Sequence, residues 1–139
     1  MAVRLLTTPI TAMLVFFTCA HALAASAPGA EVRELFRQPF PEKPGTDVVM
    51  LEVDYPPGGA TSPHEHPGYV YAYVLAGAVV SQVGNAPPHT FTQGQMWSEL
   101  PHQQHLVSKN ASSTQPAKLL VFFIVPHATK LTTFPVPSA

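Results

Sequence analysis

Apolar and polar residues alternate along most of this 139-residue chain in short runs that turn-forming residues separate. The alternation is clearest over residues 49–55, where Glu52 and Asp54 interrupt a series of apolar residues. Successive side chains of a strand point to opposite faces, so this pattern predicts a strand with one buried and one solvated face. We expect strands at residues 32–36, 48–55, 61–66, 69–75, 78–83, 89–92, 95–99, 105–109 and 118–125.

The breaks between these runs are rich in Gly, Pro and Asn and fall at residues 41–45, 56–59, 84–88 and 110–116. Many short strands with turn signals between them are typical of an all-β sandwich or barrel. No helical period runs for three turns, and 16 prolines fit a loop-rich β protein better than a helical one. Neither an internal repeat nor a second domain is visible, so we expect one all-β domain.

Two strands carry more apolar surface than a small domain readily covers. Residues 118–125 are almost continuously apolar, which indicates a strand that is buried on both faces or covered by a partner subunit. Tyr69, Tyr71 and Tyr73 share one face of the 69–75 strand, and smaller apolar residues share the other. If the smaller side chains line the interior, the tyrosines face another sheet or another protomer. We therefore predict a homodimer.

Residues 1–24 have the pattern of a signal peptide. Arg4 is the only charged residue before an apolar run over residues 10–20, and Ala22-Leu23-Ala24 is a small-x-small cleavage pattern. The run is too short for a membrane span, which needs roughly 20 apolar residues. We expect cleavage after this pattern, or at a second site in residues 25–27. The protein would then be periplasmic or secreted, with no membrane attachment after signal removal.

Cleavage would remove the only cysteine, Cys19, so packing and not disulfides would hold the mature chain together. We expect a linker and strand at residues 25–47, the main domain at 48–126 and a C-terminal tail at 127–139. The formal net charge is −1 with histidine neutral, and no basic run occurs. This composition disfavours nucleic acids and anionic membranes as partners.

Three histidines give the clearest indication of function. His64 and His66 are one residue apart, and His105 follows about 40 residues later. Residues i and i+2 of a strand project from one face, so two imidazoles would reach one point in space, as a metal requires. A distant strand of a closed sheet would bring His105 beside them. We expect His89 and His127, which lack this spacing, to be surface or hydrogen-bonded residues.

Glycines around these histidines complete two spaced blocks. The first runs from Gly58 through His64 and His66 to Gly77, and the second runs from Gly94 to His105. The blocks resemble the paired motifs of the cupin superfamily, and the resemblance covers roughly residues 48–125. It implies a single double-stranded β-helix, also described as a jelly-roll barrel, in which the three histidines hold a divalent metal inside one end.

The chain departs from these motifs where most metal cupins have a glutamate ligand, because Val70 stands at that position. His102 replaces a motif glycine, so it either tolerates a tight turn or lies near the pocket mouth. Three neutral imidazoles would leave a divalent ion its full +2 charge and favour a substrate that binds as an anion. Such sites look like those of diketone-cleaving and thiol dioxygenases. The thiol branch is disfavoured because Arg33 and Arg37, the arginines left after cleavage, precede the main domain.

Glu99 is our candidate catalytic residue because it lies in an otherwise apolar strand near His105. Its carboxylate could be a replacement metal ligand, an anchor for an imidazole N–H, or an acid/base group. A surface ion pair with Lys109 or Lys118 explains it equally well. Glu65, between the first two histidines, should point away from them and be solvated.

These features predict an exported metal-binding protein, a dioxygenase or lyase that acts on a small enolisable or phenolic compound. The alternative is a periplasmic small-molecule or metal-binding module without turnover. The cofactor would be a divalent ion of Zn, Cu, Fe, Mn or Ni. A site that forms outside the cytoplasm selects its metal by availability and affinity, and imidazole ligands rank copper and zinc above iron and manganese. We therefore expect zinc or copper in the native protein.

Overall fold

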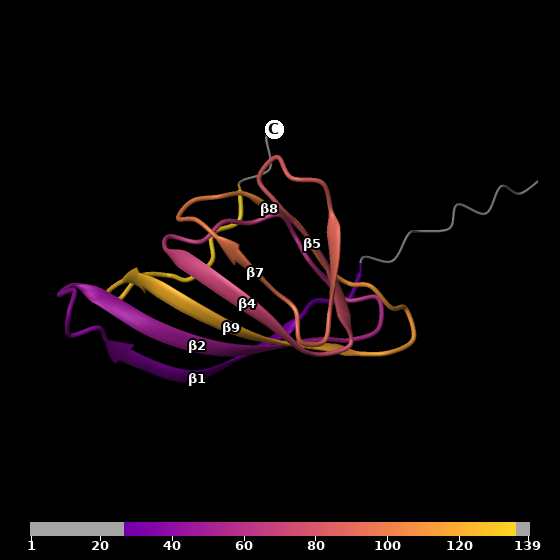
Figure 1. Ribbon diagram of the computed structural model, residues 1–139, viewed down its shortest axis with the longest axis horizontal. Coiled ribbons are helices and arrows are strands. Elements are labelled where there is room, and N and C mark those ends of the chain that lie inside the picture. The colour runs from indigo at the N-terminus through magenta and orange to yellow at the C-terminus, as the bar shows by residue number, and fades with distance from the viewer. Residues whose placement is uncertain (1–26, 136–139) are drawn as a thin grey trace, which may run out of the picture.

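A computed structural model of the protein describes residues 27–135, in which nine strands form (Figure 1). The strands are β1 (Glu31–Pro39), β2 (Thr46–Tyr55), β3 (Ala60–Thr61), β4 (Tyr69–Ala76), β5 (Ala78–Val83), β6 (His89–Thr92), β7 (Met96–Glu99), β8 (His105–Asn110) and β9 (Ala117–Pro126). Over the described residues, no helix is long and apolar enough to cross a membrane.

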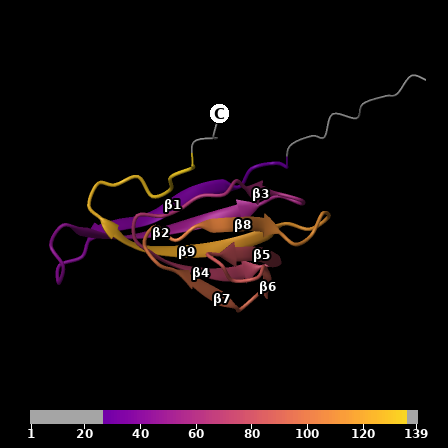
Figure 2. The same ribbon diagram turned by 90° about the horizontal axis from the view of Figure 1, so that it is seen from above.

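The strands form two antiparallel sheets that face each other (Figures 1 and 2). The five-stranded sheet has the order β1-β2-β9-β4-β7, and the four-stranded sheet has the order β3-β8-β5-β6. Strand β9 therefore lies between β2 and β4, far from its neighbours in sequence. The prediction of an all-β fold is confirmed.

Alternation along the strands places the apolar side chains between the sheets. In β2, Val49 is completely buried and Leu51 is 7% exposed, whereas Glu52 on the other face pairs with Arg33 and Lys118. Strand β4 follows the same rule, because Val70 and Val74 are buried. The buried apolar core consists of Val49, Leu51, Tyr55, Val70, Ala72, Val74, Val79, Trp97, Ala117, Leu119, Val121, Phe123 and Val125.

The outer face of the five-stranded sheet carries large apolar side chains that stay partly exposed. Tyr69, Tyr71 and Tyr73 point outward as predicted, with 42%, 39% and 42% exposure. In β9, Phe122 lies opposite Tyr71 and is 37% exposed, whereas Phe123 is buried. The alternative that this strand is buried on both faces is therefore wrong for the single chain. Cover by a partner subunit stays a prediction.

The segment that carries His64 and His66 is less regular than the sequence predicts. A strand was expected over residues 61–66, but β3 ends at Thr61. Pro63 has no N–H to donate, and Pro67 restricts the residue before it, so a continuous ladder cannot form here. Two isolated bridges remain. The backbones of His64 and His105 exchange hydrogen bonds of 3.2 and 2.8 Å, and those of Glu65 and Thr133 exchange two of 3.0 Å.

The turn between β4 and β5 explains the glycine that ends the first motif block. Gly77 has a φ of +71°, and a Cβ there would lie 2.6 Å from the carbonyl oxygen of Pro116. A residue with a side chain would be strained in this conformation and would also collide with the neighbouring strand. Glycine is therefore required to close the turn against β9.

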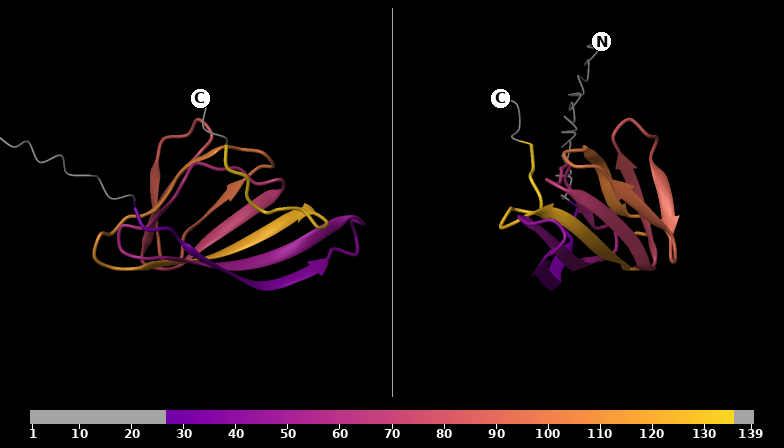
Figure 3. Two further views of the ribbon diagram at one scale, coloured as in Figure 1. Left: turned by 180° about the vertical axis from the view of Figure 1, so that it is seen from behind. Right: turned by 60° about the vertical axis from the view of Figure 1, so that its left-hand side comes forward.

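The two ends of the chain behave differently from the central strands. The expected signal peptide, with Cys19 and its cleavage pattern, lies outside the described residues, as do residues 136–139. The segment after β9, yellow in Figure 3, turns back across the molecule instead of leaving it. Residues of the expected tail thereby reach the interior pocket, as described next.

Candidate metal centre

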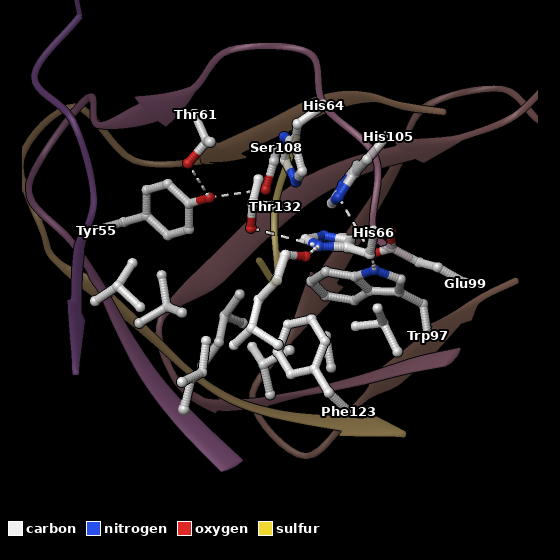
Figure 4. A pocket seen from close by; sticks show the side chains of 18 of the residues that line it. Tyr55, Thr61, His64, His66, Trp97, Glu99, His105, Ser108, Phe123 and Thr132 are labelled. Carbon is white, nitrogen blue, oxygen red and sulfur yellow. Dashed lines mark hydrogen bonds and ion pairs between the residues drawn. The ribbon is translucent and has the colours of Figure 1, made fainter. Parts of the chain in front are cut away.

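A cavity of about 460 Å³ lies between the two sheets (Figure 4). Neither lysine nor arginine occurs among the described residues that line it, and two of them, Glu34 and Glu99, are acidic. The remaining lining residues are apolar, imidazole or hydroxyl side chains: Val32, Leu51, Val53, Tyr55, Thr61, His64, His66, Val70, Ala72, Trp97, His105, Ser108, Leu119, Val121, Phe123, Leu131, Thr132 and Phe134. The wall is thus largely apolar, with polar atoms at defined points.

His64, His66 and His105 lie together at this wall (Figure 4). They are 5%, 7% and 3% exposed. The His64 ring centroid lies 4.9 Å from that of His66 and 4.8 Å from that of His105. One nitrogen from each ring lies within 4.8 Å of the other two. Small ring rotations would bring these atoms to the roughly 3.4 Å separation of tetrahedral ligands on one ion.

Each imidazole is held by one nitrogen and has its other nitrogen free of protein hydrogen bonds. His64 Nδ1 lies 2.7 Å from the Ser62 carbonyl oxygen, and His66 Nδ1 lies 2.7 Å from that of Leu131. A carbonyl can only accept, so Nδ1 of both rings donates and the Nε2 lone pair is free. His105 is held the other way, with Nε2 2.8 Å from the Ser81 hydroxyl. Fixed rings of this kind are typical of metal ligands.

Burial favours the neutral form of His64 and His66. It lowers the pKa of His64 to about 4, and neighbouring imidazoles add to this effect against the hydrogen bond from the ring to Ser62. Burial also lowers the pKa of His66. A metal binds the neutral form of imidazole, so at neutral pH no proton competes for these two lone pairs.

Glu99 lies beside the histidines and is 3% exposed. Its Oε1 accepts a hydrogen bond of 3.0 Å from Trp97 Nε1 and lies 3.2 Å from His105 Nδ1, while Oε2 lies 3.8 Å from His66 Nε2. The alternative of a surface ion pair is wrong. The carboxylate is buried, and Lys118 instead pairs with acidic residues of β2.

The neighbours of Glu99 favour its ionised form. Burial alone raises the pKa of this carboxyl, but His105, His66 and the Trp97 N–H outweigh burial and hold the pKa below its usual value. Glu99 is therefore a carboxylate at neutral pH. It brings one negative charge to the histidine group.

The residues at this site fit a divalent metal. Among the described residues, two buried side-chain atoms have no hydrogen-bond partner, Glu99 Oε2 and His105 Nδ1, and both belong to this group. Leaving such atoms unpaired in an apolar interior is costly, and a cation would satisfy both. Imidazole nitrogens with a carboxylate suit Zn, Fe, Mn, Ni and Cu.

A family model for the cupin domain matches residues 51–123, which is more than half of the chain. The chain belongs to the cupin family. The resemblance seen in the motif blocks is thereby confirmed for the fold.

Solved structures agree on the architecture of this cupin. A conserved protein with a double-stranded beta-helix domain from Klebsiella pneumoniae matches with 18% identity and a TM-score of 0.57, over 75% of this chain and 83% of that one. The DMSP lyase DddQ from Ruegeria pomeroyi matches with 18% identity and a TM-score of 0.57, over 66% of this chain and 45% of its own. A recombinant oxalate oxidase in complex with glycolate has 26% identity and a TM-score of 0.55, over 70% and 52%.

The cupin spans about half the length of these two enzymes. Among curated proteins nothing matches it. These likenesses confirm a double-stranded β-helix.

The other polar residues singled out in the sequence lie outside the histidine group. Glu65 points away from it, toward His102 Nδ1 at 3.2 Å and Gln104 Nε2 at 3.2 Å. His102 occupies a tight turn with a φ of 59°, and its N–H donates to the His66 carbonyl at 2.7 Å. His89 is exposed, and His127 pairs with Asp47 at 2.8 Å. Both therefore have the ordinary roles that the sequence suggested.

Three contributors to the site were missed in the sequence. Ser81 holds His105 from β5, Leu131 holds His66 through a backbone carbonyl, and the Phe134 ring lies 5.9 Å from that of His64. Leu131 and Phe134 belong to the segment expected to be a tail. A backbone carbonyl has no residue preference, so spacing and composition carried no signal for Leu131.

Proposed function

We propose that this cupin is a metal-dependent enzyme, a dioxygenase or lyase that acts on a small enolisable or phenolic compound. The observation that carries this proposal is the group of three buried imidazoles, each with a free nitrogen, at the wall of an apolar cavity of about 460 Å³. His64, His66 and His105 would hold the ion. A divalent metal bound there supplies a Lewis acid for an anionic oxygen of the substrate.

The cavity wall supports a substrate with an apolar body. No lysine or arginine lines the described cavity, so a carboxylate away from the metal would be buried without a partner. A phenol or enol carries its negative charge on the oxygen that faces the metal, and its carbon frame can pack against Val121 and Phe123. Oxygen donors of this kind suit the proposed site.

A group of three hydroxyls offers a second polar contact at another part of the wall. The Tyr55 hydroxyl lies 2.8 Å from Thr61 Oγ1 and 2.8 Å from Ser108 Oγ (Figure 4). Hydroxyls both donate and accept, so they can bind a neutral carbonyl or hydroxyl group of the substrate. The proposed substrate thus has one oxygen for the metal and a neutral polar group for these residues.

The similar structures support the two types of reaction proposed here, elimination and oxidation, and not a particular substrate. One is described as a DMSP lyase and another as an oxalate oxidase, so related folds host elimination as well as oxidation.

A binding module without turnover is the second candidate. The observation that favours it is the scarcity of acid/base groups, because Glu34 and Glu99 are the sole carboxylates lining the described cavity and Glu99 lies against the histidines. A ligand would then be held without a group to transfer its protons.

Substrate screening separates the two candidates. The purified protein, loaded in turn with each candidate metal, is incubated with diketones, flavonols and catechols while oxygen uptake and ultraviolet absorbance are followed. We expect conversion of at least one class, and loss of this conversion in His64→Ala. Ligands that raise Tm without conversion under any metal would favour the binding module. A protein that retains no metal would contradict the metal-dependent enzyme.

We also propose that the protein is exported and acquires zinc or copper outside the cytoplasm. The apolar run at residues 10–20 and Ala22-Leu23-Ala24 support export. Mass spectrometry of protein from the periplasmic fraction should give a chain that begins near residue 25, and elemental analysis should give mostly zinc or copper. Predominantly iron would contradict the metal assignment and favour the dioxygenase.

We further propose a homodimer through the outer face of the five-stranded sheet. Tyr69, Tyr71 and Tyr73 line up with exposed Phe122, and the charges of Glu52 and Lys118 at the edge of this face pair within the chain. An exposed aromatic group of this kind is suited to contact with a second copy of itself. Light scattering with size-exclusion chromatography should give twice the chain mass, and Phe122→Asp should give the monomer. A monomeric wild type at micromolar concentration would contradict this.

A further inference from the structure

We infer that Glu99 is a fourth protein ligand of the proposed metal, and that it reaches the site from β7. This inference rests on the proposed metal site. It selects one of the roles that the sequence left open for Glu99 and changes the charge of the site, and therefore the class of ligand that it would accept.

The Glu99 carboxylate has unused capacity to accept a hydrogen bond or bind a cation. Oε1 accepts the Trp97 N–H, whereas Oε2 is buried and has no hydrogen-bond partner in the described residues. His66 Nε2 lies 3.8 Å from Oε2, and the lone pair of that nitrogen is also free. Two lone pairs that face each other repel unless a cation lies between them. A metal ion would satisfy both.

Glu99 also lies next to the position at which most metal cupins have their glutamate ligand. In the β4–β7 pair, Glu99 lies directly opposite Val70. Both side chains point into the cavity, where Val70 is 1% exposed. Opposite residues of an antiparallel pair have Cβ atoms about 5 Å apart, so side chains from either residue reach the same part of the pocket. A carboxylate at position 99 can therefore occupy space that a longer side chain at position 70 would fill.

The remaining roles fit less well. An anchor for His105 is already present, because Ser81 holds Nε2 of that ring. His105 Nδ1 lies 3.2 Å from Glu99 Oε1, but the contact lacks hydrogen-bond geometry, so Nδ1 keeps its capacity to bind a metal. This geometry suits two ligands that converge on one ion.

The ligand class follows from the charge. A divalent ion with three neutral imidazoles and one carboxylate has a net charge of +1, where three imidazoles alone would leave +2. A monoanion such as a phenolate or an enolate neutralises this site completely. A doubly ionised catecholate would leave a negative charge in a cavity without lysine or arginine. Monoanionic oxygen donors are therefore favoured over dianionic chelators.

The test compares two acids on the purified protein with Zn²⁺ as the probe. Glu99→Gln keeps the size and the acceptor for Trp97 but removes the charge. We expect it to weaken Zn²⁺ binding by at least about 100-fold in a chelator competition. X-ray absorption should show one fewer oxygen ligand with the number of histidine ligands unchanged. Glu65→Gln is the matched control, because Glu65 points away from the same histidines, and it should change neither result.

A second variant moves the carboxylate across the strand pair. Val70→Glu in the Glu99→Gln background should recover most of the affinity and the lost oxygen ligand. If this swap restores neither, the loss in Glu99→Gln came from altered packing and the inference is overturned. A modest loss in Glu99→Gln with an unchanged oxygen count would show that Glu99 only orients His105, which also overturns it.

Failure of the inference is distinguishable from failure of the proposed function. If wild type does not bind Zn²⁺ more tightly than His64→Ala, the proposed metal site itself is wrong, and the ligand role of Glu99 is overturned with it. If wild type binds, His64→Ala does not, and Glu99→Gln equals wild type in affinity and coordination, then the inference about Glu99 alone is wrong.

Discussion

Two buried carboxylates, Asp47 in β2 and Glu99 in β7, lie beside histidines but are satisfied differently. They are 1% and 3% exposed. Asp47 Oδ1 lies 2.8 Å from His127 Nδ1, and Oδ2 lies 3.5 Å from Arg37 Nη1 and 3.4 Å from the Ala128 N–H. Both of its oxygens are thus engaged, whereas Glu99 keeps one oxygen unpartnered in the described structure.

This difference teaches how to distinguish two kinds of buried acid. Burial and a neighbouring histidine occur at both sites, so neither identifies a functional carboxylate. A carboxylate oxygen without a hydrogen-bond partner does identify one. A structural acid is stabilised by partners within the chain, whereas a binding site needs a partner from outside the chain. The following predictions test this contrast.

The largest expected effect distinguishes the histidines of the two clusters. His66→Ala removes an imidazole from the proposed metal site and should weaken Zn²⁺ binding by at least about 100-fold. His127→Ala should leave the affinity unchanged, because His127 contacts Asp47 and not the histidine group. Chelator competition measures both variants. A similar loss of Zn²⁺ affinity in both variants would contradict the proposed difference between the two histidines.

A smaller effect is expected from the residues that hold the rings. Ser81→Ala removes the hydroxyl that holds His105 and should weaken Zn²⁺ binding about 10-fold. Ser108 lies opposite Ser81 in the sheet, but its hydroxyl binds Tyr55. Ser108→Ala should therefore weaken binding of the organic ligand while Zn²⁺ affinity stays the same. Calorimetry with Zn²⁺ and with the organic ligand measures both affinities. If Ser108→Ala weakened Zn²⁺ binding and Ser81→Ala weakened only binding of the organic ligand, the roles assigned to the two serines would be reversed.

The thermal stability of the metal-free protein should distinguish the roles of Asp47 and Glu99. Asp47→Asn loses charge-assisted contacts with His127 and Arg37, and we expect Tm to fall by at least about 5 °C. Glu99→Gln keeps the acceptor for the Trp97 N–H, so Tm should change by less than about 2 °C. Thermal unfolding followed by circular dichroism gives both values. Equal decreases would mean that Glu99 is a structural acid like Asp47.

The smallest effect is the pH dependence of the Asp47 contribution. The hydrogen bond with His127 is the main reason that the pKa of Asp47 lies below its ordinary value of 3.8. A lowered folded-state pKa stabilises the fold fully above the unfolded value, and this stabilisation is lost as pH falls through the folded-state pKa. The Tm difference between wild type and Asp47→Asn should therefore be constant at neutral pH and shrink below about pH 4. A difference that persists at pH 2 would contradict this origin.

The histidine group could be predicted from sequence because its information is local. His64 and His66 sit two residues apart, so one extended segment presents both, although Pro63 and Pro67 interrupt the expected strand. Spacing alone could not give the register of β7. That register decides whether Glu99 faces the cavity or the surface, and it depends on pairing with β4, nearly thirty residues earlier in the chain.

The residues that hold the rings were harder to predict. Ser81 lies in a predicted strand, and its hydrogen-bond partner His105 is 24 residues away in the chain. Leu131 contributes an atom that every residue has. The sequence left two alternatives open for strand β9 for a related reason, since an apolar run looks the same whether its second face is covered by its own chain or by another.

The contact between the Leu131 carbonyl and His66 also bears on the order in which the barrel and the site form. Every strand of both sheets precedes Leu131 in the chain, so all of them leave the ribosome or the export channel before it does. Until the segment after β9 folds back, the His66 ring can rotate freely about its side-chain bonds. Thr133 then closes two backbone hydrogen bonds of 3.0 Å with Glu65, beside the ring. Completion of the proposed metal site thus requires the segment after β9, and we expect it to follow assembly of the barrel.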